Sequence, residues 1–205
     1  MSLTLYRFPL SGHAHRAELM LSLLGLRAEF IDVDLPGGEH NRPAFLAINA
    51  FGQVPVLDDD GTVIADSNAI LVYLAQRYGD GRWMPTAPAD QAQVQRWLSV
   101  AAGQLADSAM KARLVTVFDA PLEPEPLIAK AHALLEVMEA HLAQRLYLAT
   151  AAPTVADIAL YTYIAHAPEG NVSLQPYPNV RAWLGRIEAL EGFVAMPATA
   201  VGLRG

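Results

Sequence analysis

Ser11 is a hydroxyl residue whose position suits it to assist chemistry at a helix start. It stands directly before a segment with helical periodicity, and Arg16 follows five residues later. A serine in this position caps a helix by accepting a backbone N–H. It is also placed to act on a negatively charged group, because the N-terminal end of a helix attracts anions. The residues alone leave both roles open.

The pair Asp66–Ser67 opens a second predicted helix and is another candidate anion site. Aspartate and serine are favoured N-caps everywhere, so capping alone would explain the pair. Free N–H groups and the helix dipole at the same place also attract a carboxylate, and both roles can hold together. Upstream, Pro55 follows Val54 at the start of a predicted strand, where the missing N–H of proline breaks no ladder hydrogen bond.

Several common kinds of chemistry are excluded by residues that the sequence lacks. Cysteine is absent, which removes thiol nucleophiles, Cys-x-x-Cys redox chemistry and structural zinc fingers. The six histidines form no His-Glu-x-x-His motif, and we expect no metal site. No Walker loop, no Gly-x-Gly-x-x-Gly after a strand and no Gly-x-Ser-x-Gly elbow is present.

The composition is that of a folded protein with no affinity for nucleic acid or membrane. The chain has 205 residues, of which 53% are hydrophobic and 17% charged, and its formal net charge is −7. Disorder requires low hydrophobicity with high net charge, and binding to a phosphate backbone requires clustered Lys and Arg. No run approaches the ~18 apolar residues of a membrane span, and the N-terminus does not resemble a signal peptide.

The elements that must position these residues differ between the two halves of the chain. Strand patterns cover residues 3–8, 28–33, 54–57 and 62–65, and helix patterns cover 14–24, 43–48 and 67–78. The first strand, helix and strand form a βαβ unit, which requires parallel strands. Asp60-Gly61 between two β-branched runs predicts a hairpin.

The second half has only helical patterns. From Gly79 to Pro88 the chain carries two glycines and two prolines without periodicity, and residues 80–87 are interpreted as a linker. Residues 94–105 and 128–142 each have one apolar helix face. Thr154-x-x-Asp157 predicts a capping box, and a last helix is expected from Pro178. We therefore predict an α/β domain at residues 1–79 and an all-helical domain at residues 88–205.

Two motifs of the first half resemble the core of a cytosolic glutathione transferase: Asn49-Ala50-Phe51-Gly52-Gln53-Val54-Pro55-Val56-Leu57 and Ala65-Asp66-Ser67-Asn68-Ala69-Ile70. The Thr154-x-x-Asp157 box is similar to the folding signature of the same family, so the resemblance covers the whole chain. It implies a thioredoxin-like N-terminal domain (βαβαββα) followed by an all-helical C-terminal bundle. It further implies a cytoplasmic homodimer that uses glutathione as co-substrate and needs no other cofactor.

The resemblance also implies which residues bind glutathione: His40, Gln53, Val54, Pro55, Asp66 and Ser67. In the family the bond before the proline is cis, and the preceding backbone pairs with the tripeptide as an added strand. The acid–serine pair holds the γ-glutamyl end. Gln53, and His40 in the loop Gly37-Gly38-Glu39-His40-Asn41, are candidates for the glycine carboxylate, although Asn41 replaces the usual lysine.

Ser11 is the catalytic residue that the resemblance implies, because serine classes place a Ser a few residues before a helix Arg. In the tyrosine classes the equivalent position falls on Arg7, and Tyr6 would face the opposite side of the strand. A hydrogen bond to a charged group is worth about 1.5–3 kcal/mol, and one pKa unit is about 1.4 kcal/mol. Ser11 would therefore lower the pKa of a bound thiol by roughly one to two units.

The predicted electrophile-site residues are Phe8, Leu10, His13, Met110 and Arg113. His13 takes the position of the cysteine of zeta-like sequences, although a histidine at the surface of a helix start would explain it equally well. The electrophile itself is not predicted. Trp97 and Trp183 lie at helical spacing and are expected in the core.

Three alternative functions share this fold. A maleylacetoacetate-type isomerase would carry Ser-Ser-Cys-x-Trp, where this chain has Ser-Gly-His-Ala-His at residues 11–15. A disulfide-bond reductase would hold two glutathiones. A non-catalytic regulator that associates with RNA polymerase would not need Ser11, Gln53 and Ser67 together. Phe51, beside a glycine in a loop, is a candidate contact across a dimer.

Overall fold

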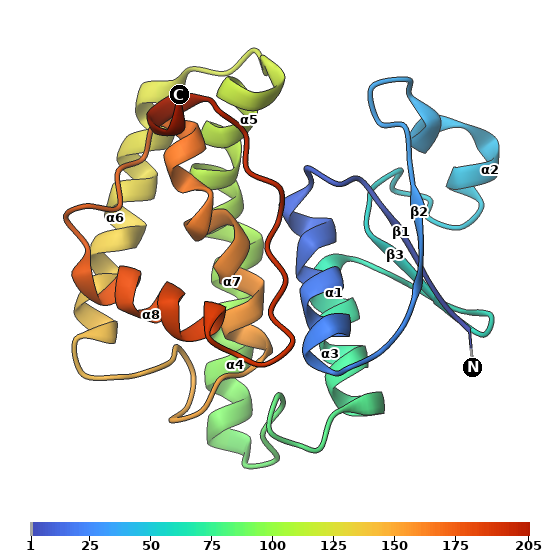
Figure 1. Ribbon diagram of the computed structural model, residues 1–205, viewed down its shortest axis with the longest axis horizontal. Coiled ribbons are helices and arrows are strands. Elements are labelled where there is room, and N and C mark those ends of the chain that lie inside the picture. Colours follow the sequence, from blue (N-terminus) through green and yellow to red (C-terminus); the bar gives the residue numbers. More distant parts are fainter. Residues whose placement is uncertain (1) are drawn as a thin grey trace.

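The computed structural model describes residues 2–205 and has an N-terminal half built on a sheet and a helical C-terminal half (Figure 1). In chain order the elements of the first half are β1 (Leu3–Arg7), α1 (Gly12–Leu23), β2 (Glu29–Asp32), η1 (Glu39–Asn41), α2 (Pro43–Leu46), β3 (Val56–Asp59), β4 (Thr62–Ala65) and α3 (Ser67–Tyr78). The strand order is β2-β1-β3-β4, with β1 and β2 parallel and the other pairs antiparallel. This arrangement confirms the thioredoxin-like topology.

The predicted hairpin is present, but its first strand lies two residues further along the chain than its β pattern. The strand begins at Val56 because Pro55 has no N–H for a ladder bond. The strand then continues through Asp58 and Asp59, although aspartate is uncommon in strands. Asp59 is held there because its carboxylate accepts hydrogen bonds from the hydroxyls of Tyr73 and Tyr78, at 2.7 and 2.5 Å. Tertiary partners therefore override the local preference.

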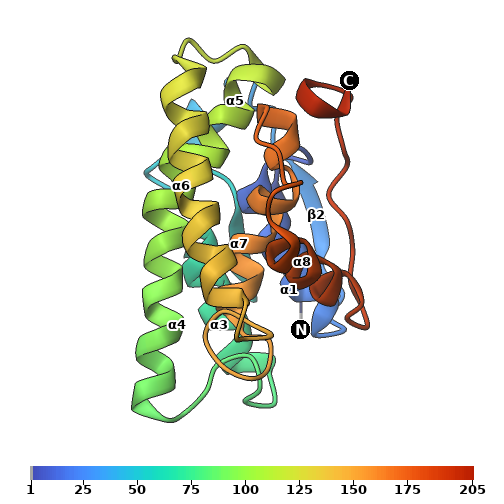
Figure 2. The ribbon, with the colours of Figure 1, turned by 90° about the vertical axis from the view of Figure 1, so that its left-hand side faces the viewer.

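The second half contains α4 (Pro88–Val100), η2 (Ala101–Met110), α5 (Lys111–Phe118), α6 (Pro124–Leu142), α7 (Val155–Ala165), η3 (Ala167–Gly170), α8 (Pro178–Glu188) and η4 (Gly202–Arg204). From α4 through α5 the helix is continuous, and η2 is a π-helical stretch in its middle, which periodicity did not reveal. Helix α6 packs along η2 in the middle of this continuous helix (Figure 2). Pro124 opens α6, where proline is favoured because it lacks an N–H and a first helical residue has no helical partner for one.

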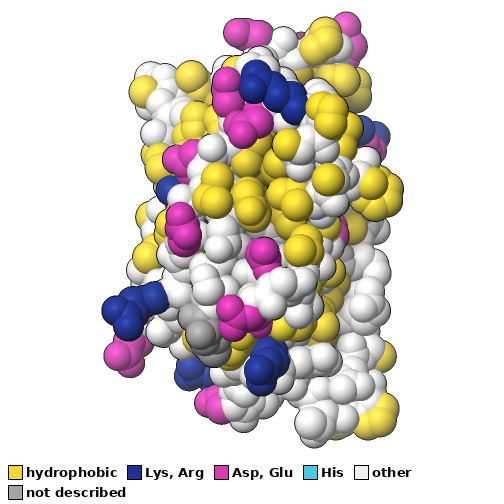
Figure 3. Space-filling model, turned by 90° about the vertical axis from the view of Figure 1, so that its right-hand side faces the viewer, with side chains coloured by type: hydrophobic (Ala, Val, Ile, Leu, Met, Phe, Trp, Pro, Cys, Tyr) yellow, Lys and Arg dark blue, Asp and Glu magenta, His cyan; other side chains and the backbone are white. Residues whose placement is uncertain are grey.

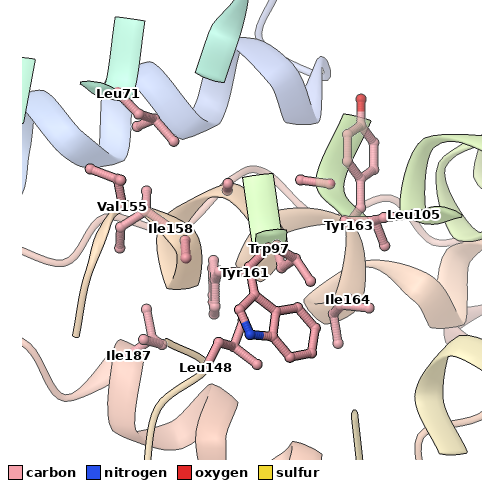
Figure 4. Packing of buried hydrophobic residues seen from close by; sticks show 14 of the residues in the cluster. Leu71, Trp97, Leu105, Leu148, Val155, Ile158, Tyr161, Tyr163, Ile164 and Ile187 are labelled. Atoms are coloured by element: carbon pink, nitrogen blue, oxygen red, sulfur yellow. The ribbon is translucent and has the colours of Figure 1, made fainter. Parts of the chain in front are cut away.

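Helix α7 lies at the centre of the molecule and is buried along almost its whole length. It contacts α1 and α3 of the first half and α4 and α8 of the second. Figure 4 shows Val155 and Ile158 of α7 near Leu71 of α3, with Leu148 and Ile187 on the other side. Trp97 and Trp183 are buried in the same core, as their spacing predicted.

The predicted capping box at the start of α7 is confirmed. Asp157 accepts hydrogen bonds from the Thr154 N–H at 2.8 Å, the Leu148 N–H at 2.9 Å and the Trp183 indole N–H at 2.9 Å. The Thr154 hydroxyl also lies 3.2 Å from the same carboxylate. One buried carboxylate therefore joins the start of α7 to the preceding loop and to α8.

The segment that follows α8 straps the two halves together (Figures 1 and 2). The Ser22 hydroxyl of α1 donates to the Gly192 carbonyl at 2.6 Å, and the His15 ring bonds to the Val194 carbonyl at 3.0 Å. The strap ends at η4, where Nη1 of Arg204 donates a hydrogen bond to the buried carboxylate of Glu169 at 2.9 Å.

Glu169 is the centre of a second buried polar cluster. Besides Arg204, its carboxylate accepts from Arg113 at 2.5 Å, from the His166 ring at 2.9 Å and from the Thr199 N–H at 2.9 Å. Burial by itself raises the pKa of Glu169, but these hydrogen bonds outweigh it and hold the pKa to about 2.

Within residues 2–205, no helix is both long and apolar enough to span a membrane.

We predict that Asp157→Ala lowers the free energy of unfolding by about 3 to 5 kcal/mol, because it leaves several buried N–H groups without an acceptor. Urea unfolding at neutral pH measures the effect. The control is Asp90→Ala, which removes a first-turn carboxylate from α4 and should cost less than about 1 kcal/mol. Equal losses for the two variants would contradict a special role for the buried carboxylate.

We further predict that Glu169 contributes to acid sensitivity. Its pKa of about 2 lies below the ordinary 4.5, so the stability it contributes is present above pH 4.5 and lost as the pH falls toward 2. Burial lowers the pKa of His166 to about 4, so losses from this histidine begin earlier, as the pH falls below 6.5.

Glu169→Gln should therefore reduce stability at pH 7 and flatten the decline below pH 4.5, because an amide cannot titrate. The measurement is the urea unfolding free energy between pH 7 and pH 3, beside the exposed control Glu136→Gln. A wild-type slope below pH 4.5 that survives in Glu169→Gln would contradict this assignment.

Candidate active site

Two adjoining cavities of about 380 and 520 Å³ lie between the two halves of the molecule. Both are lined by Ser11, His13, Leu35 and Met110, so these residues form their common boundary. The first cavity is also lined by His40, Gly52, Gln53, Val54, Pro55, Asp66 and Ser67. The structure thus brings all the residues predicted to bind glutathione to one cavity, next to the predicted catalytic serine.

Ser11 is the N-cap of α1, and its oxygen accepts the Ala14 N–H at 3.3 Å. A hydroxyl oxygen that accepts through a lone pair keeps its own proton for another partner. The side chain lines both cavities, so this proton is available at their boundary. The two roles that the sequence left open are therefore compatible in one residue.

The wall of the first cavity presents backbone groups as well as side chains. The Val54–Pro55 peptide bond is cis, as the resemblance implied. Within residues 2–205, neither the N–H nor the C=O of Val54 has a hydrogen-bond partner, which leaves both for an added strand. The Asn49 side chain donates to the Gln53 carbonyl at 2.8 Å and holds this loop in place.

At the start of α3 the structure separates the roles of Asp66 and Ser67. Asp66 is the cap, and its carboxylate accepts the N–H groups of Asn68 and Ala69 at 2.8 and 3.1 Å. Its φ of 77° is a costly conformation for aspartate, and such strain concentrates at functional sites. Because Asp66 performs the capping, the Ser67 hydroxyl is not needed for it and lines the cavity.

Arg16 is a buried cation behind the cavity boundary. It donates from Nη1 to the Ser67 hydroxyl at 3.2 Å and to the Nδ1 atom of His13 at 3.0 Å. Burial lowers its pKa to about 10, so it remains charged at neutral pH. Among the described residues it has no carboxylate within ion-pair distance. Its positive charge therefore favours an anion in the first cavity.

The second cavity is mostly apolar and contains all the predicted electrophile-site residues. Beyond the shared residues it is lined by Phe8, Leu10, Pro36, Arg113, Leu114, Phe118, Asp119 and Tyr163. The side chain of Arg113 is 1% exposed, so it forms the wall behind the surface. Its Nη1 atom donates to the Leu10 carbonyl at 2.9 Å, which ties α5 to the turn that carries Ser11.

Of the remaining candidate residues, His40 lines a cavity, whereas Tyr6 and Arg7 do not. His40 lines the first cavity, and its Nε2 atom lies 3.0 Å from the amide of Asn41. Tyr6 packs against Phe45 with ring centroids 6.5 Å apart and lines neither cavity. Arg7 is paired with Glu18 and Asp32 and lines neither cavity.

Sequence reasoning missed several residues of the site. Leu114 follows Met110 by four positions on one helix face, a spacing that could have revealed it. Tyr163 gave no such signal, because α7 is apolar on all sides. Its ring packs so closely on Gly12 that a Cβ there would come within 2.7 Å of it, so glycine is required at this contact.

Comparisons with known proteins agree with this geometry. Residues 1–76 match the glutathione S-transferase N-terminal domain, and residues 105–191 match the glutathione S-transferase C-terminal domain. Glutathione S-transferase 3 of Zea mays is 35% identical over 203 residues, which cover 93% of this chain and 91% of the maize protein. Two solved structures also superpose closely.

A glutathione S-transferase from Pseudomonas fluorescens has a TM-score of 0.90 and 34% identity, with 96% of this chain and 99% of that chain covered. A delta-class glutathione transferase of Nilaparvata lugens has a TM-score of 0.85 and 30% identity, with 93% and 90% covered. The two domain matches, the shared fold and the similarity over nearly the full length show that this chain belongs to the glutathione S-transferase family of enzymes.

Proposed function

We propose that Ser11 stabilises the thiolate of bound glutathione, which then attacks a small hydrophobic electrophile. The observation that carries this proposal is the place of the Ser11 hydroxyl, at the boundary of two cavities that differ in character. The first is lined by polar and backbone groups that suit a peptide, and the second by aromatic and aliphatic side chains. The reacting sulfur belongs where they meet.

Glutathione has two carboxylates and one peptide segment that this site can bind. The γ-glutamyl carboxylate belongs at Ser67, where the start of α3 and the charge of Arg16 attract an anion. The unpaired backbone of Val54 pairs with the cysteinyl segment as an added strand. Gln53 and His40 line the same cavity and bind the glycine carboxylate.

The reaction needs no proton-accepting side chain in this arrangement. Ser11 donates a hydrogen bond to the sulfur, which lowers the pKa of the thiol and leaves more of it ionised at neutral pH. The N-terminal end of α1 adds to the same effect. The thiolate then forms a carbon–sulfur bond with an electrophile seated among Phe8, Leu10 and Phe118 in the second cavity.

We also propose that the protein is a homodimer, in keeping with its family. Phe51 lies in the loop between α2 and β3, and 84% of its surface is exposed. It therefore does not pack into its own domain, and exposure of an aromatic ring this large favours contact with another chain. Figure 3 shows hydrophobic side chains among scattered charges on one face of the N-terminal half.

We predict that Ser11→Ala raises the pKa of the bound thiol by roughly one to two units and slows conjugation with an aryl halide at neutral pH. Affinity for glutathione should change little, because the rest of the tripeptide binds elsewhere. The measurement is a pH titration of thiolate absorbance in the complex, run beside the conjugation rate.

Two further variants separate the donor from the helix cap. Ser11→Gly keeps most of the capping stability but has no hydroxyl, and should behave like Ser11→Ala. Ser11→Thr retains a hydroxyl and should titrate like the wild type. If Ser11→Ala and Ser11→Gly both keep the wild-type titration and rate, Ser11 is only a cap, and the donor is a backbone N–H of Gly12 or His13.

For the dimer, we predict that Phe51→Ser shifts the protein toward single chains of 22.1 kDa. Light scattering at micromolar concentration measures the mass. Leu146→Ser is a suitable control, because Leu146 is also an exposed apolar residue, at 58%, and lies far along the chain from Phe51. A wild-type mass of one chain at this concentration would refute the dimer.

A further inference from the structure

His13 stands at the boundary of the two cavities with each of its ring nitrogens near a different group. Its Nδ1 atom lies 3.0 Å from Nη1 of Arg16 and 3.3 Å from the Ser67 hydroxyl. Its Nε2 atom lies 3.2 Å from the sulfur of Met110, which comes from the other half of the molecule. The ring is also held edge-on against Tyr163, with centroids 5.0 Å apart.

These neighbours determine where the imidazole carries its proton. A guanidinium can only donate hydrogen bonds, so Nδ1 must present a lone pair to Arg16. A neutral imidazole has one N–H, which is then on Nε2. Burial and the adjacent charge of Arg16 lower the pKa of His13 to about 3, so the ring stays neutral throughout the working range of the enzyme.

The Nε2–H group is poorly used by the protein itself. A thioether sulfur is a weak acceptor, and the methionine side chain that carries it is flexible. His13 is half-buried and Met110 lines both cavities, so a ligand in the second cavity can reach this N–H. An oxygen of the electrophile would be a better acceptor than the sulfur it displaces.

We propose that His13 is a second catalytic donor: its Nε2–H binds the carbonyl oxygen of a conjugated carbonyl electrophile and stabilises the negative charge that develops there. The inference rests on the proposed thiolate activation by Ser11. It makes His13 a specificity-determining residue, because an electrophile without such an oxygen gains nothing from the donor.

The step balances without any other reactant. The thiolate sulfur supplies an electron pair and forms a bond with the β-carbon of the C=C–C=O group. The π pair of the C=C bond moves to form an enolate, whose oxygen carries the negative charge. His13 donates a hydrogen bond to that oxygen and keeps its own proton. The proton that the thiol released to solvent when it ionised then returns from solvent to the α-carbon, so the addition of the thiol across C=C is neutral overall. A fixed, neutral donor of this kind resembles those of oxyanion holes.

The test compares kcat/KM for an enone with kcat/KM for a benzylic halide that has no oxygen, both with glutathione. His13→Phe keeps an aromatic ring beside Tyr163 and removes the donor. We expect the enone-to-halide ratio to fall by roughly 10- to 100-fold, the loss of a hydrogen bond to a developing charge. His13→Gln, which retains an N–H donor, should recover most of the ratio. His13→Leu is a second donor-free variant if His13→Phe does not fold.

Each outcome separates this inference from the proposed function. Ser11→Ala should lower both rates together and leave the ratio within about threefold of the wild type. An unchanged ratio in the donor-free His13 variants would overturn the inference alone. It would also be overturned if both rates fell equally while the pKa of the bound thiol rose, since the donor would then serve the sulfur. A wild type that conjugates neither substrate would refute the proposed function, and this inference with it.

Discussion

The burial of one carboxylate, that of Asp157, is the constraint on which the rest of the structure depends. Its hydrogen bonds fix the start of α7, and both halves of the molecule pack on that helix. At the other end of α7, Tyr163 packs on Gly12 and so sets the distance between the helical half and the start of α1. The site at α1 therefore depends on a capping box far from it.

Two buried guanidiniums act on the site in different ways. Arg113 is neutralised by Glu169, and its Nη1 atom holds the Leu10 carbonyl next to Ser11. Arg16 has no such partner among residues 2–205 and directs its charge toward Ser67 and His13. Arg113 therefore positions the backbone of Leu10. The charge of Arg16 favours an anionic ligand and determines which nitrogen of His13 carries the proton.

Much of the fold could be predicted because its signals are local. The βαβ unit, the Asp60-Gly61 hairpin and the capping box each depend on residues a few positions apart. The continuation of β3 through Asp59 and the π-helical stretch at Ala101–Met110 could not. The first depends on hydroxyl partners from α3, and the second on packing against α6 and α7. The roles of the site residues stay predictions.

By itself, the sequence determined the family, the order of the elements and the residues that the structure gathers around the first cavity. Only the tertiary structure decided which of those residues cap a helix and which groups their side chains hydrogen-bond. Ser11 and Asp66 cap their helices, yet Ser11 keeps its hydroxyl proton for the cavity. Because Asp66 is the cap of its helix, the Ser67 hydroxyl lines the cavity instead and accepts from Arg16. The state of His13 follows from Arg16, Ser67 and Met110, which lie 3, 54 and 97 positions away along the chain. A hydrogen bond depends on distance in space, and sequence periodicity carries no record of contacts between helices that meet only after folding.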